Sequence, residues 1–282
     1  MIYVSTGYFK NYQAREIIKL FNENKINNIE LSGGKFQKDI NSFLPKLKKK
    51  YNFQIHNYFP PPKFAKVINL ASGNKKIVED SIILIKKAIN LCNKINSKYY
   101  SFHAGFLADL SPKDLGKSKR KLKEINKSKG LDNFLKNVEI VSNYASKKNV
   151  KILLENNVIG KYNYKLFKKN PFLMADLEDI NLIMNNTPKN VNLLLDLGHL
   201  KVSSNTLNFD KHKVHEESKQ WIKAYHLSEN NGFEDTNSKI KLNSWFINKL
   251  KKVDSYTLEV YTKNFNIMKN QIRVLNKILK NN

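Results

Sequence analysis

Short apolar runs alternate with longer charged stretches along the whole chain. The longer stretches carry apolar residues at helical spacing, as in 14–24, 77–95, 131–147 and 263–279. The short runs are rich in aliphatic and aromatic residues, as buried strands are. Eight such runs can be counted: Ile2–Ser5, Asn28–Leu31, Phe53–His56, Tyr99–His103, Val150–Leu154, Val191–Asp196, Ile222–His226 and Ser255–Glu259. Strand followed by helix, eight times over, predicts a parallel sheet.

Eight strand–helix units with right-handed crossovers close most simply into a (β/α)8 TIM barrel, which typically needs about 250 residues. The prediction is therefore an α/β protein with one barrel domain over residues 1–282. An open doubly wound sheet is the alternative. The first predicted strand runs into Ser5-Thr6-Gly7-Tyr8, which lacks the glycine spacing of a dinucleotide site, so a nicotinamide enzyme is disfavoured. The polar, lysine-rich stretch Pro112–Lys129 is predicted to be a mobile surface insertion.

The composition indicates the kind of compartment in which the protein works. With 41% hydrophobic residues, the 282-residue chain can bury a sizeable core without cross-links. Its single cysteine, Cys92, allows no internal disulfide and fits a reducing compartment. The sequence has neither a signal-like start nor an apolar run long enough to cross a membrane. We therefore expect a cytoplasmic protein with no membrane partner.

The formal net charge of +26 raises the question of a nucleic-acid partner. All but three of the 50 basic residues are lysines, the exceptions being Arg15, Arg120 and Arg273, whereas base and phosphate recognition favours arginine. Lysine, asparagine and isoleucine are abundant over the whole length, as an AT-biased coding sequence would produce. The charge therefore favours a compositional origin, and nucleic acid stays the less favoured partner.

Chemistry-bearing residues collect where the predicted strands end. Because a barrel of this kind places its active site at the C-terminal ends of its strands, these side chains should converge. They are His56, His103, Glu155, Asp196 with His199 just beyond, His226 and Glu259. The other two histidines, His212 and His215, lie in the charged segment 209–220 and are predicted to be solvated helix residues.

Convergence of these groups on a barrel axis predicts a metal site. Glu155 follows Ile152-Leu153-Leu154 and Asp196 follows Leu193-Leu194-Leu195, so both carboxylates should be buried. Unpaired like charges are very costly there, and a divalent cation removes the cost. Carboxylate and neutral imidazole are common ligands of Zn, Mn, Fe and Co. Two Glu, one Asp and one His make a complete ligand set.

The same series resembles the xylose isomerase-like TIM-barrel superfamily over almost the whole chain. The motifs that carry the resemblance are Ile55-His56-Asn57, Phe102-His103-Ala104-Gly105, Leu154-Glu155-Asn156, Asp196-Leu197-Gly198-His199, His226-Leu227-Ser228-Glu229-Asn230 and Leu258-Glu259. That superfamily contains sugar isomerases, ketose 3-epimerases, inosose-type dehydratases and isomerases, and the endonuclease IV class of abasic-site DNA repair enzymes. The resemblance implies a sugar isomerase or epimerase, with an abasic-site endonuclease or phosphodiesterase as the alternative.

The epimerase pattern implies a single catalytic cation (Mn, Mg, Co or Zn). Its ligands would be Glu155, Asp196, His226 and Glu259, and Glu155 and Glu259 would also move the proton between carbon atoms. His199 would contact the substrate. In known epimerases an arginine follows the strand-seven histidine closely, whereas this chain has Asn231-Gly232-Phe233. That departure argues against a simple free ketose.

The endonuclease pattern uses more of the same positions. It implies a first zinc on His56, His103 and Glu155. A second zinc would be held by Glu155, Asp196, His226 and Glu259, and His199 would bind a third. That third site needs an Asp-x-His element, and this chain has Asp235-Thr236-Asn237 instead. The arginine-bearing DNA loop after strand two is replaced by Glu30-Leu31-Ser32-Gly33-Gly34-Lys35, as in the sugar-isomerase branch. His56 and His103 are therefore candidates for a second metal or for substrate.

Further substrate contacts are expected from the loops on the active-site face. Aromatic rings suit the apolar face of a sugar, and lysines there suit a phosphate or carboxylate. The expected contacts, besides His199, are Tyr58, Phe59, Glu229 and Asp235. A barrel that has lost catalysis and only binds a metal or metabolite is a third hypothesis, and retention of Glu155 and Glu259 opposes it. The resemblance also implies a homo-oligomer.

Overall fold

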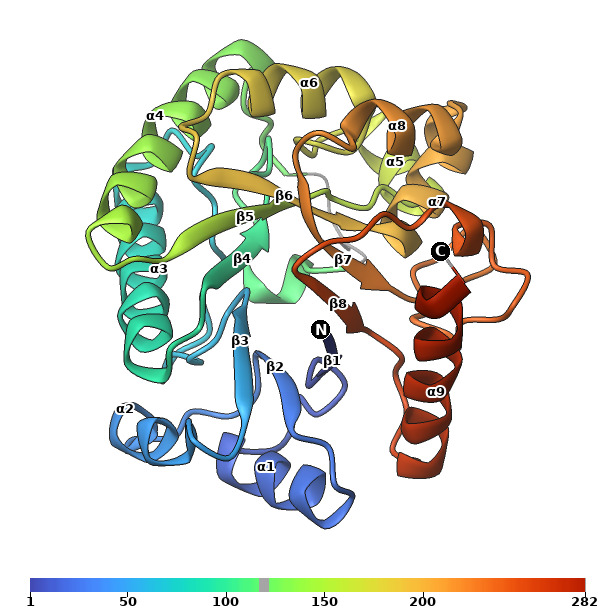
Figure 1. Ribbon diagram of the computed structural model, residues 1–282. Coiled ribbons are helices and arrows are strands. Elements are labelled where there is room, and N and C mark those ends of the chain that lie inside the picture. The colour runs from blue at the N-terminus through green and yellow to red at the C-terminus, as the bar shows by residue number, and fades with distance from the viewer. Residues whose placement is uncertain (117–121, 282) are drawn as a thin grey trace.

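Eight parallel strands form a closed barrel in the computed structural model, which describes residues 1–116 and 122–281 (Figure 1). The strand order around the barrel is the order along the chain, and β1 pairs with both β2 and β8. The predicted TIM barrel is confirmed, and the alternative of an open sheet is wrong. The strands are β1 Ile2–Ser5, β2 Asn28–Ser32, β3 Asn52–His56, β4 Tyr99–His103, β5 Lys151–Glu155, β6 Val191–Asp196, β7 Ile222–Leu227 and β8 Ser255–Leu258.

Helices surround the barrel on its outside (Figure 1). The longest, α3, α4 and α9, correspond to sequence-predicted helices whose ends differ from the observed ones by up to four residues. The helices are α1 Ala14–Glu23, α2 Ile40–Phe43, α3 Lys75–Ile95, α4 Lys127–Ser146, α5 Lys161–Phe167, α6 Leu177–Asn185, α7 Leu197–Leu207, α8 Lys211–Ser218 and α9 Phe265–Asn281. Short 3-10 turns lie at Leu44–Leu47, Pro112–Asp114 and Ile247–Lys249.

Helix α1 and strand β2 show how the sequence builds this layering. Ile17 and Phe21 lie one turn apart on the buried face of α1, and the helix begins with a capping box between Gln13 and Glu16. Ile29 and Leu31 of β2 belong to the same apolar core. Because side chains alternate across a strand, Glu30 between them projects to the other side, into the barrel. A polar residue is thereby carried into the interior.

Two expectations about exposed segments need correction or restriction. His215 is fully buried on α8, where its Nε2 lies 2.9 Å from the hydroxyl of Tyr225, so its prediction as a solvated residue was wrong. The Nδ1 atom of His212 is also buried, and the His212 ring packs edge-on against the ring of Trp245. Residues 117–121 of the predicted insertion 112–129 lie outside the described residues. On either side of them, Asp114 and Leu122 are buried.

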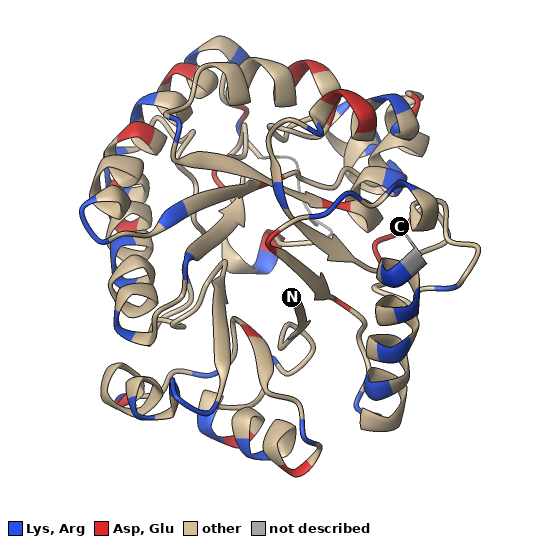
Figure 2. Ribbon diagram, in the orientation of Figure 1, with Lys and Arg blue, Asp and Glu red and all other residues tan. Residues whose placement is uncertain are grey.

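Lysines lie on helices all round the barrel and are interspersed with acidic residues (Figure 2). A recognition surface for nucleic acid would gather them on one face. The distribution of lysines in Figure 2 therefore fits a general excess of lysine better than a single basic patch. Within residues 1–116 and 122–281, no helix has the length and hydropathy needed to cross a membrane.

Candidate metal centre

Strand register brings the predicted site residues together at the C-terminal end of the barrel. His103 of β4 is the register partner of Glu155 of β5, and Asp196 of β6 is the partner of His226 of β7. Glu259 directly follows β8. The sequence-predicted residues His56, His103, Glu155, Asp196, His199, His226 and Glu259 therefore form one cluster, whose members come from six different strands or the residues directly after them.

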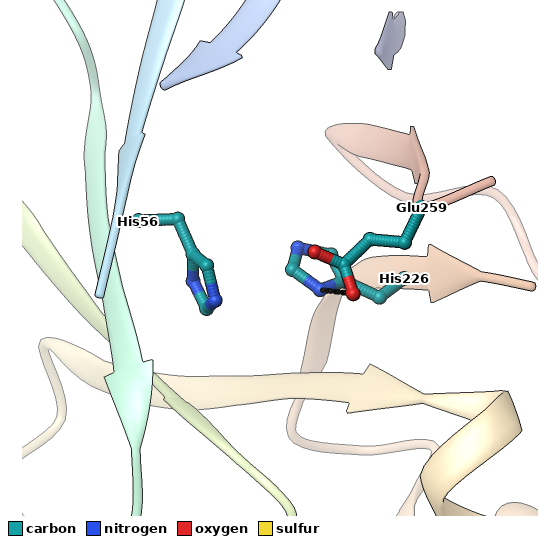
Figure 3. Close-up of side chains that lie close together, drawn as sticks. All are labelled: His56, His226 and Glu259. Atoms are coloured by element: carbon teal, nitrogen blue, oxygen red, sulfur yellow. Dashed lines mark ion pairs between the residues drawn. The ribbon is translucent and has the colours of Figure 1, made fainter. Parts of the chain in front are cut away.

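Three carboxylates face the Nδ1 atom of His226. Oε1 of Glu155 lies 3.1 Å from Nδ1, Oε2 of Glu259 lies 3.8 Å away and Oδ2 of Asp196 lies 3.9 Å away. All four side chains are buried. Figure 3 shows His226 and Glu259 side by side, and the ring of His56 across a gap from both.

The carboxylate of Glu155 also reaches a second group of ligands. Its other oxygen, Oε2, lies 3.1 Å from Nδ1 of His103 and 3.4 Å from Nε2 of His56. His56 is held by Ser101, whose hydroxyl lies 2.9 Å from Nδ1. Glu155 therefore stands between two clusters, one with His56 and His103 and one with Asp196 and His226.

Glu30 is a buried member of the site that was not predicted from the sequence. Its Oε2 lies 2.9 Å from Nε2 of His226 and accepts a hydrogen bond of 3.0 Å from the hydroxyl of Thr257. The Nε2–H of His226 therefore donates to Glu30, and in the neutral ring this places the lone pair on Nδ1, the atom that faces the three carboxylates. The signal available in the sequence was a glutamate flanked by two apolar residues inside a short strand.

Asp196 and His199 are fixed by the start of α7. Asp196 caps the helix, its Oδ1 accepting a 2.6 Å hydrogen bond from the backbone N–H of His199. The side chain of Asn156 bonds both the N–H and the carbonyl of Asp196. Nε2 of His199 lies 3.3 Å from Oδ2 of Asp235, which comes from the loop after β7.

That loop is fastened to α7, which explains the position of Asp235. The ammonium of Lys201 bonds the carboxylate of Glu229 at 2.9 Å and the carbonyl of Asn230 at 2.7 Å. Asn205 donates to the carbonyl of Gly232, a residue with φ of +82°. A side chain at Gly232 would collide with Asn205 and would also be strained at this φ. Glu229 therefore holds the loop and does not line the cavity.

Burial and mutual repulsion shift the pKa values of the carboxylates. Burial, together with Glu155, Asp196 and Glu30, raises the pKa of Glu259 to about 8. Burial, together with Asp235 and Glu155, raises the pKa of Asp196 to about 6. Burial lowers the pKa of His226, but Glu30, Glu259 and Glu155 outweigh it and raise that pKa well above its usual value. The pKa of Glu155 shifts the other way: burial raises it, but His103, His56 and His226 outweigh burial and lower it well below its usual value.

Buried atoms without hydrogen-bond partners mark where a cation fits. Among the described residues, both carboxylate oxygens of Glu155, Oδ2 of Asp196 and Nδ1 of His226 are buried and make no hydrogen bond. Such atoms are costly unless something pairs with them. Ligand atoms of Glu155, Asp196 and His226 all lie within 4.8 Å of one another, as do those of His56, His103 and Glu155. Oxygen and imidazole donors suit Mn, Zn, Co or Mg, so the residues present fit a divalent cation.

A cavity of about 300 Å³ opens directly above the cluster. Tyr58, His199 and Asp235 line it, as the sequence analysis expected of substrate-contacting residues, together with Phe106, Phe167 and Tyr261. Phe59 does not line it, because its ring is buried in the apolar core. Polar groups therefore form the floor of the cavity, and aromatic rings contribute to its walls.

The fold and the site define a (β/α)8 barrel with a buried cluster of carboxylates and histidines at the C-terminal end of its strands. A sequence model described as the xylose isomerase-like TIM barrel matches residues 34–254. The chain belongs to this family.

Solved structures of similar shape cover nearly the whole chain. A D-tagatose 3-epimerase-like protein superposes with a TM-score of 0.71 at 19% identity, covering 99% of both chains. A D-psicose 3-epimerase with D-tagatose from Clostridium cellulolyticum gives 0.66 at 10% identity, also covering 99% of both. A Thermus thermophilus protein soaked with ZnCl2 gives 0.64 at 12% identity, covering 100% of this chain and 98% of the other. No curated protein matches the sequence. At these identities the likeness establishes the fold alone.

Proposed function

We propose that the protein is a divalent-metal-dependent isomerase or epimerase of a sugar or sugar derivative, which moves a carbon-bound proton through an enediolate. The observation that carries the proposal is the convergence of Glu155, Asp196 and Glu259 on Nδ1 of His226 beneath the cavity. The epimerase-like names of the similar structures support it. Cys92, the only cysteine, and the absence of a membrane-spanning helix in the described residues agree with a cytoplasmic enzyme.

The two glutamates would do the proton transfer. When bound, a cation held by Glu155, Asp196, His226 and Glu259 would polarise a carbonyl and stabilise the negative charge that develops on its oxygen. Glu259 borders the cavity and is held by Ser5, whose hydroxyl donates to Oε1 at 3.1 Å. Oε1 of Glu155 lies 3.1 Å from Nδ1 of His226, the same atom that Oε2 of Glu259 approaches to 3.8 Å. One glutamate would remove the proton from carbon, and the other would return it to the neighbouring carbon or to the opposite face.

His199 and Asp235 would hold the sugar hydroxyls. His199 and Asp235 both line the cavity, and Asp235 keeps the ring of His199 oriented through the 3.3 Å contact with its Nε2. The backbone carbonyl of Asn156 lies 3.0 Å from Nδ1 of the same ring. Both ring nitrogens are therefore engaged, and the orientation of His199 is fixed before substrate binds.

Deuterium exchange tests the proposal without requiring the substrate to be known in advance. The protein loaded with Mn²⁺, Co²⁺ or Zn²⁺ is incubated in D2O with a panel of ketoses and aldoses, free and phosphorylated, and proton NMR follows the carbon beside the carbonyl. We expect cation-dependent deuterium incorporation into at least one sugar. The Glu259→Gln variant should lose it, and Glu139→Gln, an exposed change on α4, should keep it. Stoichiometric cation binding without exchange into any sugar would refute the proposal.

A second candidate is a zinc-dependent phosphodiesterase of the abasic-site endonuclease type. The observation in its favour is the cluster of His56, His103 and Glu155, which could hold a second cation. Asn237 opposes it, because its amide donates to Oε2 of Glu259 at 3.4 Å where the pattern requires an imidazole. Cleavage of an abasic-site DNA duplex by the zinc-loaded protein would favour this candidate, and no cleavage would exclude it.

A further inference from the structure

A second hollow continues outward from the cavity over the metal centre. It has a volume of about 490 Å³, against about 300 Å³ for the inner cavity. Ligand sites typically span about 300–1,000 Å³, so the inner cavity alone is at the small end of that range. The two hollows share six lining residues: Lys10, Gly116, Val158, Asn163, Asp235 and Tyr261. A ligand seated over the metal centre can therefore extend into the outer hollow.

Exposed aromatic rings line this outer hollow. Phe233, in the loop after β7, is 52% exposed, and Tyr162, on α5, is 50% exposed. The ammonium of Lys161 lies 5.0 Å from the centre of the Phe233 ring. Large apolar rings left in water beside a binding site are typical of surfaces that bind a ligand. Their faces suit the apolar face of a sugar ring.

Charge in the outer hollow is balanced over the part of the chain that the structure describes. Within residues 1–116 and 122–281, its charged lining residues are two lysines, Lys10 and Lys161, and two acids, Glu234 and Asp235. A site for a phosphate or carboxylate would present an excess of positive charge. Aromatic walls with balanced charge instead favour a neutral polyhydroxylated ring, which offers both an apolar face and hydroxyls for polar groups at the edge.

We propose that the outer hollow is a subsite for a second, neutral sugar ring, so that the substrate is a disaccharide or longer glycoside whose reacting ring lies in the inner cavity. This inference rests on the proposed function and adds the substrate class. Phe233 and Tyr162 would contact the second ring, and Lys10, which lines both hollows, would lie beside the link between the rings. It also accounts for Phe233 in a loop that carries an arginine in known epimerases.

Binding measurements test the subsite separately from catalysis. Ligand-observed NMR with the cation-loaded protein would compare a panel of ketose-ended disaccharides with their component monosaccharides and with monosaccharide phosphates. We expect at least one disaccharide to bind ten times more tightly than its component ketose. Tighter binding of the phosphates than of every disaccharide would overturn the proposal, and so would equal binding of disaccharides and monosaccharides.

Matched variants locate the effect. Phe233→Ala should reduce the affinity for the disaccharide to that for the monosaccharide and leave the latter unchanged. Phe36→Ala is the control, because Phe36 is 44% exposed and lines neither hollow. Equal losses for both ligands in Phe233→Ala, or no loss, would refute the subsite. Monosaccharide binding and deuterium exchange without any gain from a second ring would leave the proposed function standing, whereas a protein that binds no sugar would refute both.

Discussion

Glu30 and His226 form a buried carboxylate–imidazole pair across the barrel, from β2 to β7, with 2.9 Å between Oε2 and Nε2. In the neutral ring the pair assigns the proton to Nε2, so that Nδ1, once it has lost its own proton, can bind a cation. A carboxylate behind a histidine ligand also makes the ring a stronger donor. Glu30 is thus a positioning residue for the metal centre.

Replacing Glu30 should weaken cation binding without unfolding the barrel. In Glu30→Gln the amide can still accept from Nε2–H, but it lacks the negative charge, and we expect a loss of about 10–100-fold in metal affinity. Competition with a chromogenic chelator measures it. Thr257→Val removes only the hydroxyl that bonds the same carboxylate, and it should cost less. Unchanged affinity in Glu30→Gln would show that the ring is oriented by packing alone.

Cation binding should release a proton from Glu259 near neutral pH. Because its pKa is raised to about 8 in the cation-free protein, Glu259 is largely protonated at pH 7 and must ionise to bind a cation. Affinity should therefore rise as the pH increases from 6 to 8. Calorimetry in buffers of different ionisation enthalpy counts the protons released. Glu259→Gln should release fewer protons than the wild type, and equal release would place the proton elsewhere.

His103 decides how many cations the centre holds. It contributes to the cluster with His56 and Glu155 but not to the group around Nδ1 of His226. Under the isomerase proposal, His103→Ala should retain about one cation per chain by inductively coupled plasma mass spectrometry and keep cation-dependent exchange. A wild type with two zincs, reduced to one by this change together with lost DNA cleavage, would support the phosphodiesterase instead.

His215 should make folding stability depend on pH. Burial lowers its pKa to about 4 in the folded protein, whereas in the unfolded chain it is near the ordinary value of about 6.5. The unfolded state then binds more protons between these values, so stability is complete above pH 6.5 and falls as the pH drops towards 4. The expected loss between pH 7.5 and 5 is about 2 kcal/mol.

Urea unfolding at both pH values measures this loss. His215→Gln removes the titrating ring, so its own change in stability between the two pH values should be smaller by about 2 kcal/mol than that of the wild type. Carboxylates of the metal centre contribute equally to both proteins and cancel in the comparison. Parallel changes in wild type and variant would mean that His215 does not titrate in this range.

The strands were predictable because each is a short run with apolar residues that ends in a polar residue or directly before one. The observed ends of β4 and β6 coincide with the predicted ones, and that of β5 is one residue later. His215 escaped prediction because α8 has only eight residues, too few for its apolar periodicity to stand out among charged neighbours. Its burial depends on Tyr225 and Trp245, which come from other elements.

Some residues of the site could also be predicted from the sequence, and others could not. Residues at strand ends could be predicted from topology alone, because parallel strands deliver their C-terminal residues to one face. Glu30 lies within its strand, and only the register of β2 against its neighbours shows that it reaches His226. The direction of a loop side chain is even less accessible from sequence: Tyr58 lines the cavity while Phe59, the next residue, turns into the core.

Closure of the barrel between β1 and β8 has a consequence for how the protein matures. The ligands are spread along the chain, from Glu155 on β5 to Glu259 after β8, so the ligand set is incomplete until β8 and the residue after it have been synthesised. A growing chain that has completed only β7 lacks Glu259 and the strand that pairs with β1. Metal capture is therefore tied to synthesis of β8 and Glu259, and chains that end before this strand should remain metal-poor and be left to proteolysis.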